Sequence, residues 1–229
     1  MSGPKLSILM AVYNGSKHVQ NAILSILAQS YSDFEFIIIN DGSTDDTLEK
    51  IKAFHDSRIV LINQKNQGLT KSLNNALSIA KGEFIARQDP DDISIFDRLE
   101  RQFNRFDKEP ELDMIGTSMF ISNPKGIYNE IFHYPQTDSE CKTALLKYNP
   151  FIHGSVMLRK RALDNIGGYN ESFRYVQDYE LWGRLVPLIK CCNLSEPLYA
   201  RLRDKDCSET TIDKTEYVNK IQEKISYFK

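Results

Sequence analysis

Short apolar runs alternate with polar segments over the first 92 residues, and four of these runs have the length of a strand. They cover residues 6–13, 34–39, 58–63 and 82–88. Between them, apolar positions recur at helical spacing, which predicts helices over residues 16–27, 45–54 and 69–80. Because the connections are short, neighbouring strands should be parallel, and helices should cover both faces of the sheet. The pattern predicts an α/β fold.

The second half of the chain has a less regular pattern. Strand-like runs cover residues 113–121, 155–159 and 198–203, and helical spacing covers residues 95–106, 139–146, 160–165, 179–188 and 215–228. No segment rich in Gly, Ser or Pro separates a second domain. We therefore expect one domain in two parts, residues 1–110 and 111–208, followed by a C-terminal amphipathic helix over residues 209–229.

The composition of the 229 residues is that of an ordinary globular protein, with 41% hydrophobic and 26% charged residues. A net charge of −2 gives no electrostatic reason to expect nucleic acid or an anionic membrane as the main partner. The four cysteines show no C-x-x-C spacing, so we expect reduced thiols and no zinc site.

The sequence enters its first apolar run without a basic-apolar leader, and no apolar stretch reaches about 18 residues. We expect a cytoplasmic protein, or one that lies peripherally at the inner face of the plasma membrane and contacts it through its C-terminal segment. The sequence leaves open whether the chain is part of a longer protein, and it leaves the oligomeric state open.

Three carboxylates, Asp89, Asp91 and Asp92, directly follow the fourth apolar run. In an open α/β sheet, the carboxyl ends of the strands face the ligand crevice. Like charges this close repel one another, and a divalent cation with oxygen ligands would stabilise their ionised forms. The alternative is a polar turn in which Asp92 or Ser94 caps the next helix.

The strand-end loops lack the glycine patterns of the common nucleotide folds. Neither G-x-G-x-x-G nor G-x-x-x-x-G-K-[ST] is present. The absence of the first pattern disfavours an NAD-dependent oxidoreductase. If a nucleotide binds, a metal ion is the candidate for holding its phosphates.

Seven segments of the chain, taken together and in order, carry a family resemblance. They are residues 7–14 (SILMAVYN), 39–45 (INDGSTD), 66–69 (NQGL), 81–92 (KGEFIARQDPDD), 153–159 (HGSVMLR), 166–169 (IGGY) and 177–185 (QDYELWGRL). Over roughly residues 5–205, the chain resembles the inverting family 2 nucleotide-sugar glycosyltransferases. The resemblance implies a GT-A type fold, in which a Rossmann-like, mostly parallel sheet with helices on both faces continues into a mixed acceptor-side half.

The resemblance also assigns roles to the strand-end loops. It places Ala11 and Tyr13 beside the base and ribose, and Asp41 where a carboxylate accepts a hydrogen bond from the base. Asn66 and Gly68 match the third loop, where a missing side chain lets the backbone approach the nucleotide. Taken alone, Tyr13 could instead be a core tyrosine. Residues 1–110 would form the nucleotide-sugar-binding half.

The acidic cluster matches the D-x-D motif of the family. The resemblance assigns the Mn²⁺ or Mg²⁺ ligand to Asp91 and places Asp89 near the ribose and the donor sugar. Asp92 is then either a neighbour that supports the metal site or a cap of the next helix. The metal would offset the charge that develops on the leaving diphosphate.

The catalytic base implied by the resemblance is Asp178, in the half formed by residues 111–208. The family pairs this aspartate with a Glu, whereas this chain has Gln177. The loss of a neighbouring charge should make Asp178 a slightly weaker base, because less like-charge repulsion lowers its pKa. The alternative role for Asp178 is that of a helix N-cap.

A second departure concerns the histidine that completes the metal site in many family members. Arg203 occupies the matching position, and arginine cannot ligate a cation but can pair with a diphosphate. His153 is the other candidate ligand, and we favour a packing or acceptor-contacting role for it.

The resemblance implies an enzyme that transfers a sugar from a nucleoside-diphosphate sugar, most commonly UDP-linked, to a glycan or lipid-linked acceptor. The product would be a capsule, lipopolysaccharide or exopolysaccharide. Gln177 and Arg203 raise a competing hypothesis, a catalytically silent nucleotide-sugar or glycan-binding module. Acceptor specificity is expected within about residues 123–149, which contain no recognisable motif.

Overall fold

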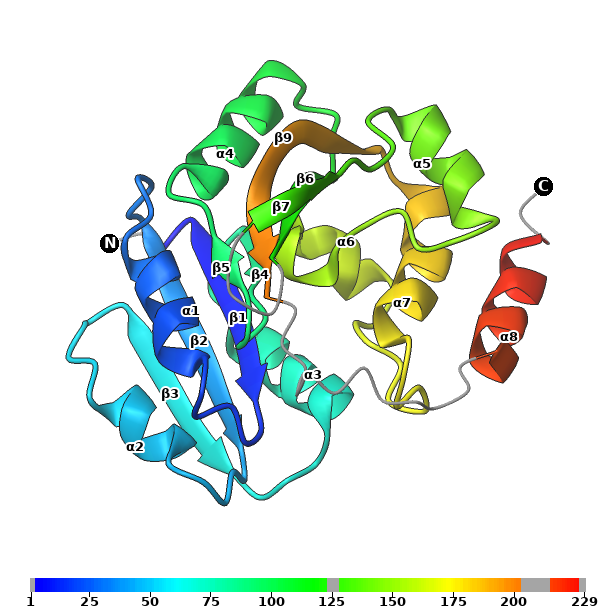
Figure 1. The fold of residues 1–229 in the computed structure, drawn as a ribbon. Coiled ribbons are helices and arrows are strands. Elements are labelled where there is room, and N and C mark those ends of the chain that lie inside the picture. The colour runs from blue at the N-terminus through cyan, green and yellow to red at the C-terminus, as the bar shows by residue number, and fades with distance from the viewer. Residues whose placement is uncertain (1–2, 123–127, 203–214, 227–229) are drawn as a thin grey trace.

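The computed structural model of the chain describes residues 3–122, 128–202 and 215–226, and these residues fold around one sheet (Figure 1). Its strands are β1 (Leu6–Val12), β2 (Phe34–Asp41), β3 (Ile59–Gln64), β4 (Phe84–Arg87), β5 (Ile93–Ser94), β6 (Met114–Ser122), β7 (Tyr128–Phe132), β8 (Met157–Arg159) and β9 (Cys191–Arg201). They lie in the order β3-β2-β1-β4-β8-β6-β9-β5, and β7 pairs with β6.

Helices cover both faces of this sheet. They are α1 (Val19–Leu27), α2 (Thr47–Lys52), α3 (Leu69–Ile79), α4 (Arg98–Lys108), α5 (Asp138–Leu145), α6 (Lys160–Asn165), α7 (Gln177–Leu185) and α8 (Thr215–Ser226), with 3₁₀ turns η1 (His153–Ser155) and η2 (Val186–Leu188). A hydrophobic core lies on each face of the sheet, and adjacent side chains of β1 pack in different cores. Leu9 belongs to the core formed with α3 and α7, and Ile8 belongs to the core formed with α1 and α4. Burial on both faces explains why these strands are continuous apolar runs in the sequence.

The first half of the sheet is parallel, as expected. Strand β1 pairs in parallel with both β2 and β4, so that Leu6 lies opposite Phe34 on one side and Phe84 on the other. Strand β3 extends the parallel part beyond β2. The carboxyl ends of these four strands therefore lie at one edge of the sheet, where their loops can meet.

The second half of the sheet is mixed and continues the first without a break. Strand β8 is antiparallel to β4 and to β6, whereas β9 is parallel to β6. The two halves thus share one set of backbone hydrogen bonds, and the mixed strand order expected for the second half of a GT-A type fold is confirmed.

Two strands were not expected from the sequence. Strand β5 has two residues, and it pairs Ile93 with Ala200 of β9. Strand β7 pairs Phe132 with Met119 of β6 at the edge of the sheet. A two-residue strand carries no measurable periodicity, and an edge strand exposed on one side carries little apolar signal.

The structure corrects the helix-capping alternative for the acidic turn. Helix α4 begins at Arg98 with Asp97 as its N-cap residue, several positions later than expected. Ser94 is buried, and its Oγ donates a 2.6 Å hydrogen bond to Gln88 Oε1. Asp92 accepts a 3.3 Å hydrogen bond from the backbone N–H of Leu202 instead of capping a helix.

The C-terminal amphipathic helix is present as α8, which packs against α7 through the buried side chain of Ile221. Among the described helices, none combines the length and apolar character that crossing a bilayer requires. Cys141, Cys191 and Cys192 are buried free thiols, and Cys207 lies outside the described residues.

Candidate active site

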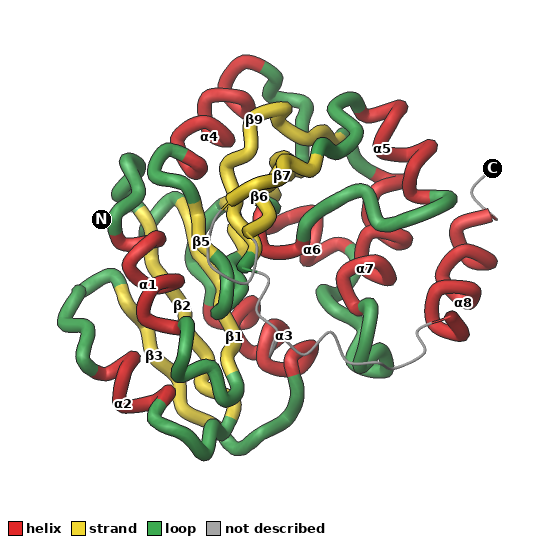
Figure 2. The backbone as a smooth tube through the Cα atoms, in the orientation of Figure 1, coloured by secondary structure: helices red, strands yellow, loops and turns green. Residues whose placement is uncertain are grey.

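A cleft of about 910 Å³ lies between the two halves of the domain. Figure 2 shows the loops that follow β1, β2 and β3 at the same end of the sheet. Five residues singled out in the sequence line this cleft: Tyr13, Asp41, Asn66, Gly68 and Asp178. The structure therefore brings four of the residues expected at the nucleotide together with the residue expected to be the base, although 110 positions separate Gly68 from Asp178. Ala11, Asp89 and Asp91 do not line this cleft.

Asp41 is the last residue of β2, and its buried carboxylate holds the third loop in place. Its Oδ1 accepts hydrogen bonds from Gln64 Nε2 at 2.7 Å and from the Gln67 backbone N–H at 2.9 Å. Its Oδ2 accepts a bond from the Gly68 backbone N–H at 2.8 Å, and Gly68 has φ +90°. The glycine is needed here because a side chain would strain this backbone conformation. Oδ1 thus accepts two hydrogen bonds, whereas Oδ2 accepts one and keeps a second lone pair for a ligand.

Tyr13 lies at the rim of the cleft, and its side chain is 53% exposed. The alternative of a buried core tyrosine is therefore wrong. Hydrogen bonds hold the loop that follows it, since the Asn14 backbone N–H donates to Ser43 Oγ at 3.0 Å and the Thr44 N–H donates to Asn14 Oδ1 at 2.8 Å. Ala11, by contrast, is buried in the core with α3, and only its backbone could contact a ligand.

Gln88 fixes the turn that carries the acidic cluster. Its Nε2 donates to the backbone oxygens of Asp89 and Asp92, both at 2.9 Å. Its Oε1 accepts from Ser94, so the amide is satisfied at both ends. Because the Gln88 side chain is buried, the turn is held from beneath and its carboxylates have a defined position.

Asp89 is held by a buried arginine, Arg87, which is the last residue of β4. Arg87 Nη2 donates to Asp89 Oδ1 at 2.6 Å, and Nη1 donates to the backbone oxygens of Leu9 at 2.6 Å and Gln88 at 3.0 Å. A short, charge-assisted bond of this kind fixes the direction of the carboxylate. Asp89 keeps about a quarter of its side chain exposed, so it can still face a ligand.

Gly154 makes room for this arrangement. A Cβ atom at that position would collide with the Tyr199 hydroxyl and lie 2.8 Å from Asp89 Oδ2. The Tyr199 hydroxyl in turn accepts a 3.1 Å hydrogen bond from the Asp89 backbone N–H. Any larger residue at Gly154 would therefore displace both groups.

The three carboxylates of the acidic turn interact as like charges. Burial raises the pKa of Asp92 well above its ordinary value, and the charges of Asp91 and Asp89 raise it further, while Arg201 lowers it. Asp91 is partly exposed beside them. Within the part of the chain that the structure describes, no three His, Cys, Asp or Glu side chains are arranged to hold a metal by themselves.

His153 is a packing residue. It is buried in η1, its Nε2 lies 2.8 Å from the Tyr169 hydroxyl, and it accepts a 3.2 Å hydrogen bond from Arg87 Nε. Burial and the Arg87 charge lower its pKa well below the usual value, so the ring is neutral. Because Nε2 faces a guanidinium group, His153 does not replace the missing metal ligand.

Asp178 lies in the first turn of α7, after Val176, which is the N-cap residue. The alternative of Asp178 as an N-cap is therefore wrong. Its Oδ2 accepts a 2.7 Å hydrogen bond from Asn149 Nδ2. Val176 has φ 50°, a left-handed conformation that costs a β-branched residue about 1–3 kcal/mol. The strained residue lines the cleft and sets the direction from which α7 enters it.

Burial raises the pKa of Asp178 above its ordinary value, and the negative charge of Asp89 acts in the same direction. The Asn149 amide opposes the shift because it stabilises the ionised form. Because Gln177 is neutral, it does not raise the pKa of Asp178 as a neighbouring Glu would, which predicts a slightly weaker base. Burial raises this pKa and so makes Asp178 a stronger base. Burial is the largest cause of the shift, so Asp178 is suited to accept a proton.

Sequence reasoning missed the residues that support the site. Arg87, Gln88, Asn149 and Tyr199 contact the predicted aspartates directly. Arg87 and Gln88 could have been found from the sequence, since they are polar residues at the end of an apolar run. A buried arginine in particular needs a carboxylate partner, which points to the neighbouring aspartates. No sequence signal marks Asn149 or Tyr199. Arg203, expected at the diphosphate, lies outside the described residues.

Comparison with known proteins places the chain among sugar transferases. The sequence model of Glycosyl transferase family 2 matches residues 7–167. EpsE of Bacillus subtilis, which carries a glycosyltransferase assignment, is 37% identical over 90% of this chain and 75% of its own length. The O-antigen biosynthesis glycosyltransferase WbnJ of Escherichia coli is 34% identical over 90% of this chain and 83% of its own length.

The fold also matches a solved structure. TarS residues 1–349 of S. aureus, in complex with UDP-GlcNAc, align with a TM-score of 0.80 and 21% identity over 98% of this chain. The chain spans 66% of that TarS fragment.

Proposed function

The chain belongs to glycosyl transferase family 2, and from this premise we propose that it transfers a sugar from a UDP-linked donor, with inversion, to a hydroxyl of a glycan or lipid-linked acceptor. The product we propose is a cell-surface glycan: a capsule, lipopolysaccharide or exopolysaccharide. WbnJ is named for O-antigen biosynthesis, and TarS binds UDP-GlcNAc, which supports this choice. The proposed location is the cytoplasm or the inner face of the plasma membrane.

One observation carries the proposal: a single cleft holds the nucleotide loops on one wall and Asp178 on the other. Tyr13 offers an exposed ring for the base, and Asp41 Oδ2, which accepts only one hydrogen bond from the described residues, offers a lone pair in the same cleft. In this assignment residues 1–110 bind the nucleotide sugar, and residues 111–208 bind the acceptor and supply the base.

The reaction follows from the positions of these groups. A sugar hydroxyl has a pKa far above neutrality, so it needs a base within hydrogen-bond reach. Asp178 takes the proton while the hydroxyl oxygen attacks the anomeric carbon from the face opposite the diphosphate. The bond between the anomeric carbon and the diphosphate oxygen breaks, and UDP leaves with the electron pair. A single displacement of this kind inverts the anomeric centre.

The acidic turn has the ligand chemistry of a Mn²⁺ or Mg²⁺ site, because its carboxylate oxygens are hard donors that repel one another when no cation is bound. We assign Asp91 as the protein ligand, and the oxygens of the diphosphate would complete the coordination. When bound, the metal offsets the charge that develops on the leaving group. Asp89, fixed by Arg87, is assigned to the ribose and the donor sugar, and Arg203 to the diphosphate.

The experiment that tests the function is an assay of nucleoside diphosphate release. The full chain is incubated with a panel of nucleotide sugars, Mn²⁺ and fragments of bacterial surface glycans as acceptors. Acceptor-dependent release of UDP is expected from one donor. UDP binding without release from any donor would instead support the silent-module hypothesis, and equal background release by wild type and Asp178→Asn would reject the enzyme.

Replacing Asp91 by alanine should remove the effect of Mn²⁺ on nucleotide binding. In the wild type, Mn²⁺ should increase the affinity for UDP. In Asp91→Ala we expect this increase to be smaller by about 10–100-fold, because the metal loses a protein ligand. Titration calorimetry with UDP, with and without Mn²⁺, measures this gain. Asp97→Ala, a carboxylate at the start of α4, is the control. An unchanged Mn²⁺ effect in Asp91→Ala would place the metal elsewhere.

Replacing Asn149 by alanine should move the acid limb of the pH–rate profile to higher pH. The Asn149 amide stabilises the ionised carboxylate of Asp178, so its removal raises the pKa of Asp178 further. The plateau rate at high pH should change less than the rate at low pH. Profiles of kcat/KM against pH check this, with Asn104→Ala on the exposed side of α4 as the control. A limb that stays in place would show that Asp178 is not the titrating base.

A further inference from the structure

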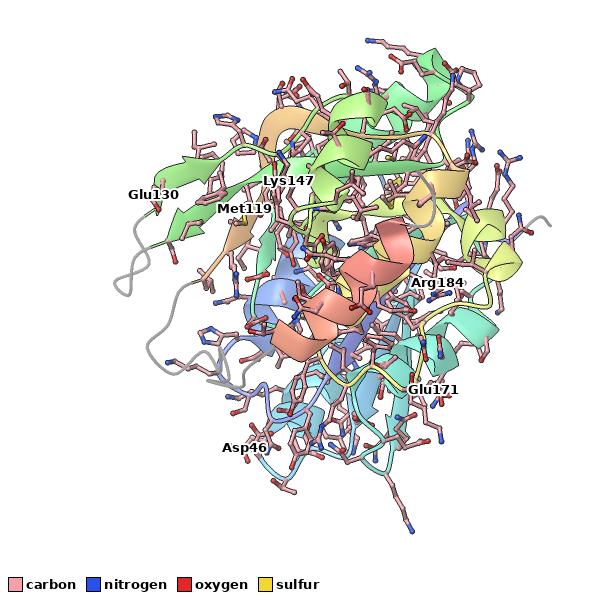
Figure 3. The ribbon with its side chains drawn as sticks, turned by 90° about the vertical axis from the view of Figure 1, so that its right-hand side faces the viewer. Asp46, Met119, Glu130, Lys147, Glu171 and Arg184 are labelled. Carbon is pink, nitrogen blue, oxygen red and sulfur yellow. The ribbon has the colours of Figure 1, made fainter. Side chains whose placement is uncertain are left out.

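A second cavity, of about 680 Å³, lies beside the cleft. It is a groove between α5 and the segment of residues 133–137 that precedes it. Lys147 and Tyr148 line both the cleft and this groove, so the two spaces adjoin. Figure 3 labels Lys147 at this junction, where its backbone oxygen accepts a hydrogen bond from Gln222 of α8.

The junction is close to the proposed base. Asn149 follows Tyr148 in sequence and donates the 2.7 Å hydrogen bond to Asp178. Tyr134 lines the groove; burial raises its pKa to about 12, with Arg201 opposing the shift and the negative charge of Asp178 adding to it. A molecule that extends from Asp178 along the wall of the cleft reaches the groove after passing Tyr148.

The groove lining combines aromatic rings with polar groups, of which Glu140 and Lys147 are charged, and the Glu140 carboxylate is used in the capping box of α5. Tyr148 is 51% exposed, and Tyr134 lies deeper. Gln136, Ser139 and Thr143 add amide and hydroxyl groups. The C–H face of a sugar ring packs on an aromatic ring, and its hydroxyls pair with amides and hydroxyls, so this lining matches carbohydrate. An isoprenoid or acyl chain would need a lining with few polar groups.

We propose that this groove binds the sugar units of an oligosaccharide acceptor that precede the unit receiving the new sugar. The inference rests on the proposed function and adds to it that the acceptor is a chain of at least two or three units. The accepting unit lies at Asp178, the next unit packs on Tyr148, and the following units occupy the groove beside Thr143. The groove thus makes the enzyme prefer longer acceptors.

Thr143 is the position for a selective block. It lines the groove but not the cleft, and its Oγ1 donates a 2.8 Å hydrogen bond to the Ser139 backbone oxygen within α5. Thr143→Trp fills the groove from an exposed helical position, and Thr143→Ala tests the loss of the hydroxyl alone. Ser78→Trp is the matched control, because Ser78 is an exposed α3 residue whose hydroxyl also bonds to its own helix.

The probes are immobilised fragments of capsule, O-antigen and exopolysaccharide glycans with one to five sugar units. In at least one series, wild-type affinity should rise about tenfold or more from one unit to three. Thr143→Trp and Tyr148→Ala should lose this gain, whereas Thr143→Ala and Ser78→Trp should keep it. The proposal is overturned if no series gains with length, if Thr143→Trp keeps the gain, or if a polyprenyl diphosphate without sugar competes for the groove.

The affinity for UDP, measured separately on the same proteins, distinguishes failure of the proposed function from failure of the groove proposal. Thr143→Trp should bind UDP within about twofold of the wild type, because Thr143 does not line the cleft. If the wild type does not bind UDP, the proposed function fails, and the dependence on glycan length still reports on the groove. If UDP binds and length has no effect, the function stands and the groove proposal fails.

Discussion

Asp178→Asn should lower the rate of sugar transfer by about 10²–10⁴-fold, the range that removal of a general base produces. The amide has nearly the shape of the carboxylate and can still form a hydrogen bond with Asn149, so the cleft should keep its structure. The amide cannot accept the proton of the acceptor hydroxyl. The loss should therefore appear in kcat, with little change in the affinity for UDP.

The measurement is acceptor-dependent UDP release under saturating donor, together with calorimetric titration of UDP. Asp164→Asn on α6 is the matched control, because its exposed carboxylate forms a surface ion pair with Lys160 of the same helix. A decrease of less than about tenfold in Asp178→Asn would show that another group takes the proton. Equal losses of UDP affinity and rate would show that the substitution disturbs the donor site.

Arg87→Met should destabilise the protein by about 3–5 kcal/mol, the cost of removing one partner from a buried ion pair. Arg87 is fully buried and donates to Asp89, to His153 and to two backbone oxygens. Methionine fills much of the volume but leaves these acceptors without a donor. The direction of the Asp89 carboxylate should also be lost, so donor affinity should fall in the protein that remains folded.

Denaturant unfolding followed by Trp182 fluorescence measures the loss of stability. Arg161→Met is the control, since Arg161 is 68% exposed and its ion pair with Asp113 lies at the surface, where such pairs contribute about 0–1 kcal/mol. Adding Asp89→Asn to Arg87→Met should recover part of the stability, because the unpaired charge is removed. Equal destabilisation by the two arginine variants would contradict a structural role for the Arg87–Asp89 pair.

The parallel half of the fold was predictable because β1, β2 and β4 are buried on both faces, and only the edge strand β3 is partly exposed. Runs such as residues 36–39 are apolar at every position because they fit between two helical layers, and such runs are visible without knowledge of any contact. The acidic turn was predictable for a related reason. Three carboxylates after a buried strand have to lie at the edge of the sheet, where ligands bind.

The missed elements are those whose stability comes from distant partners. Strand β5 exists because Ile93 pairs with Ala200, and Ser94 is buried because its hydroxyl bonds to Gln88. The alternative interpretation of Ser94 or Asp92 as a helix cap considered only the residues that are near in sequence. Ser94 and Asp92 form hydrogen bonds with residues distant from the helix start instead of capping it. These bonds satisfy the same hydroxyl and carboxylate groups in a buried position.

The sequence by itself determined the α/β pattern of the first half, the acidic turn and the family to which the chain belongs, because these depend on local order and spacing. The tertiary structure alone decided which groups support the turn: Arg87 beneath Asp89, Gly154 beside it, and Asn149 on Asp178. It also decided the pKa of Asp178, since burial depends on neighbours far away in the chain. The acidic turn is therefore a property of the sequence, whereas the hydrogen bonds that support it and the burial of Asp178 are properties of the fold.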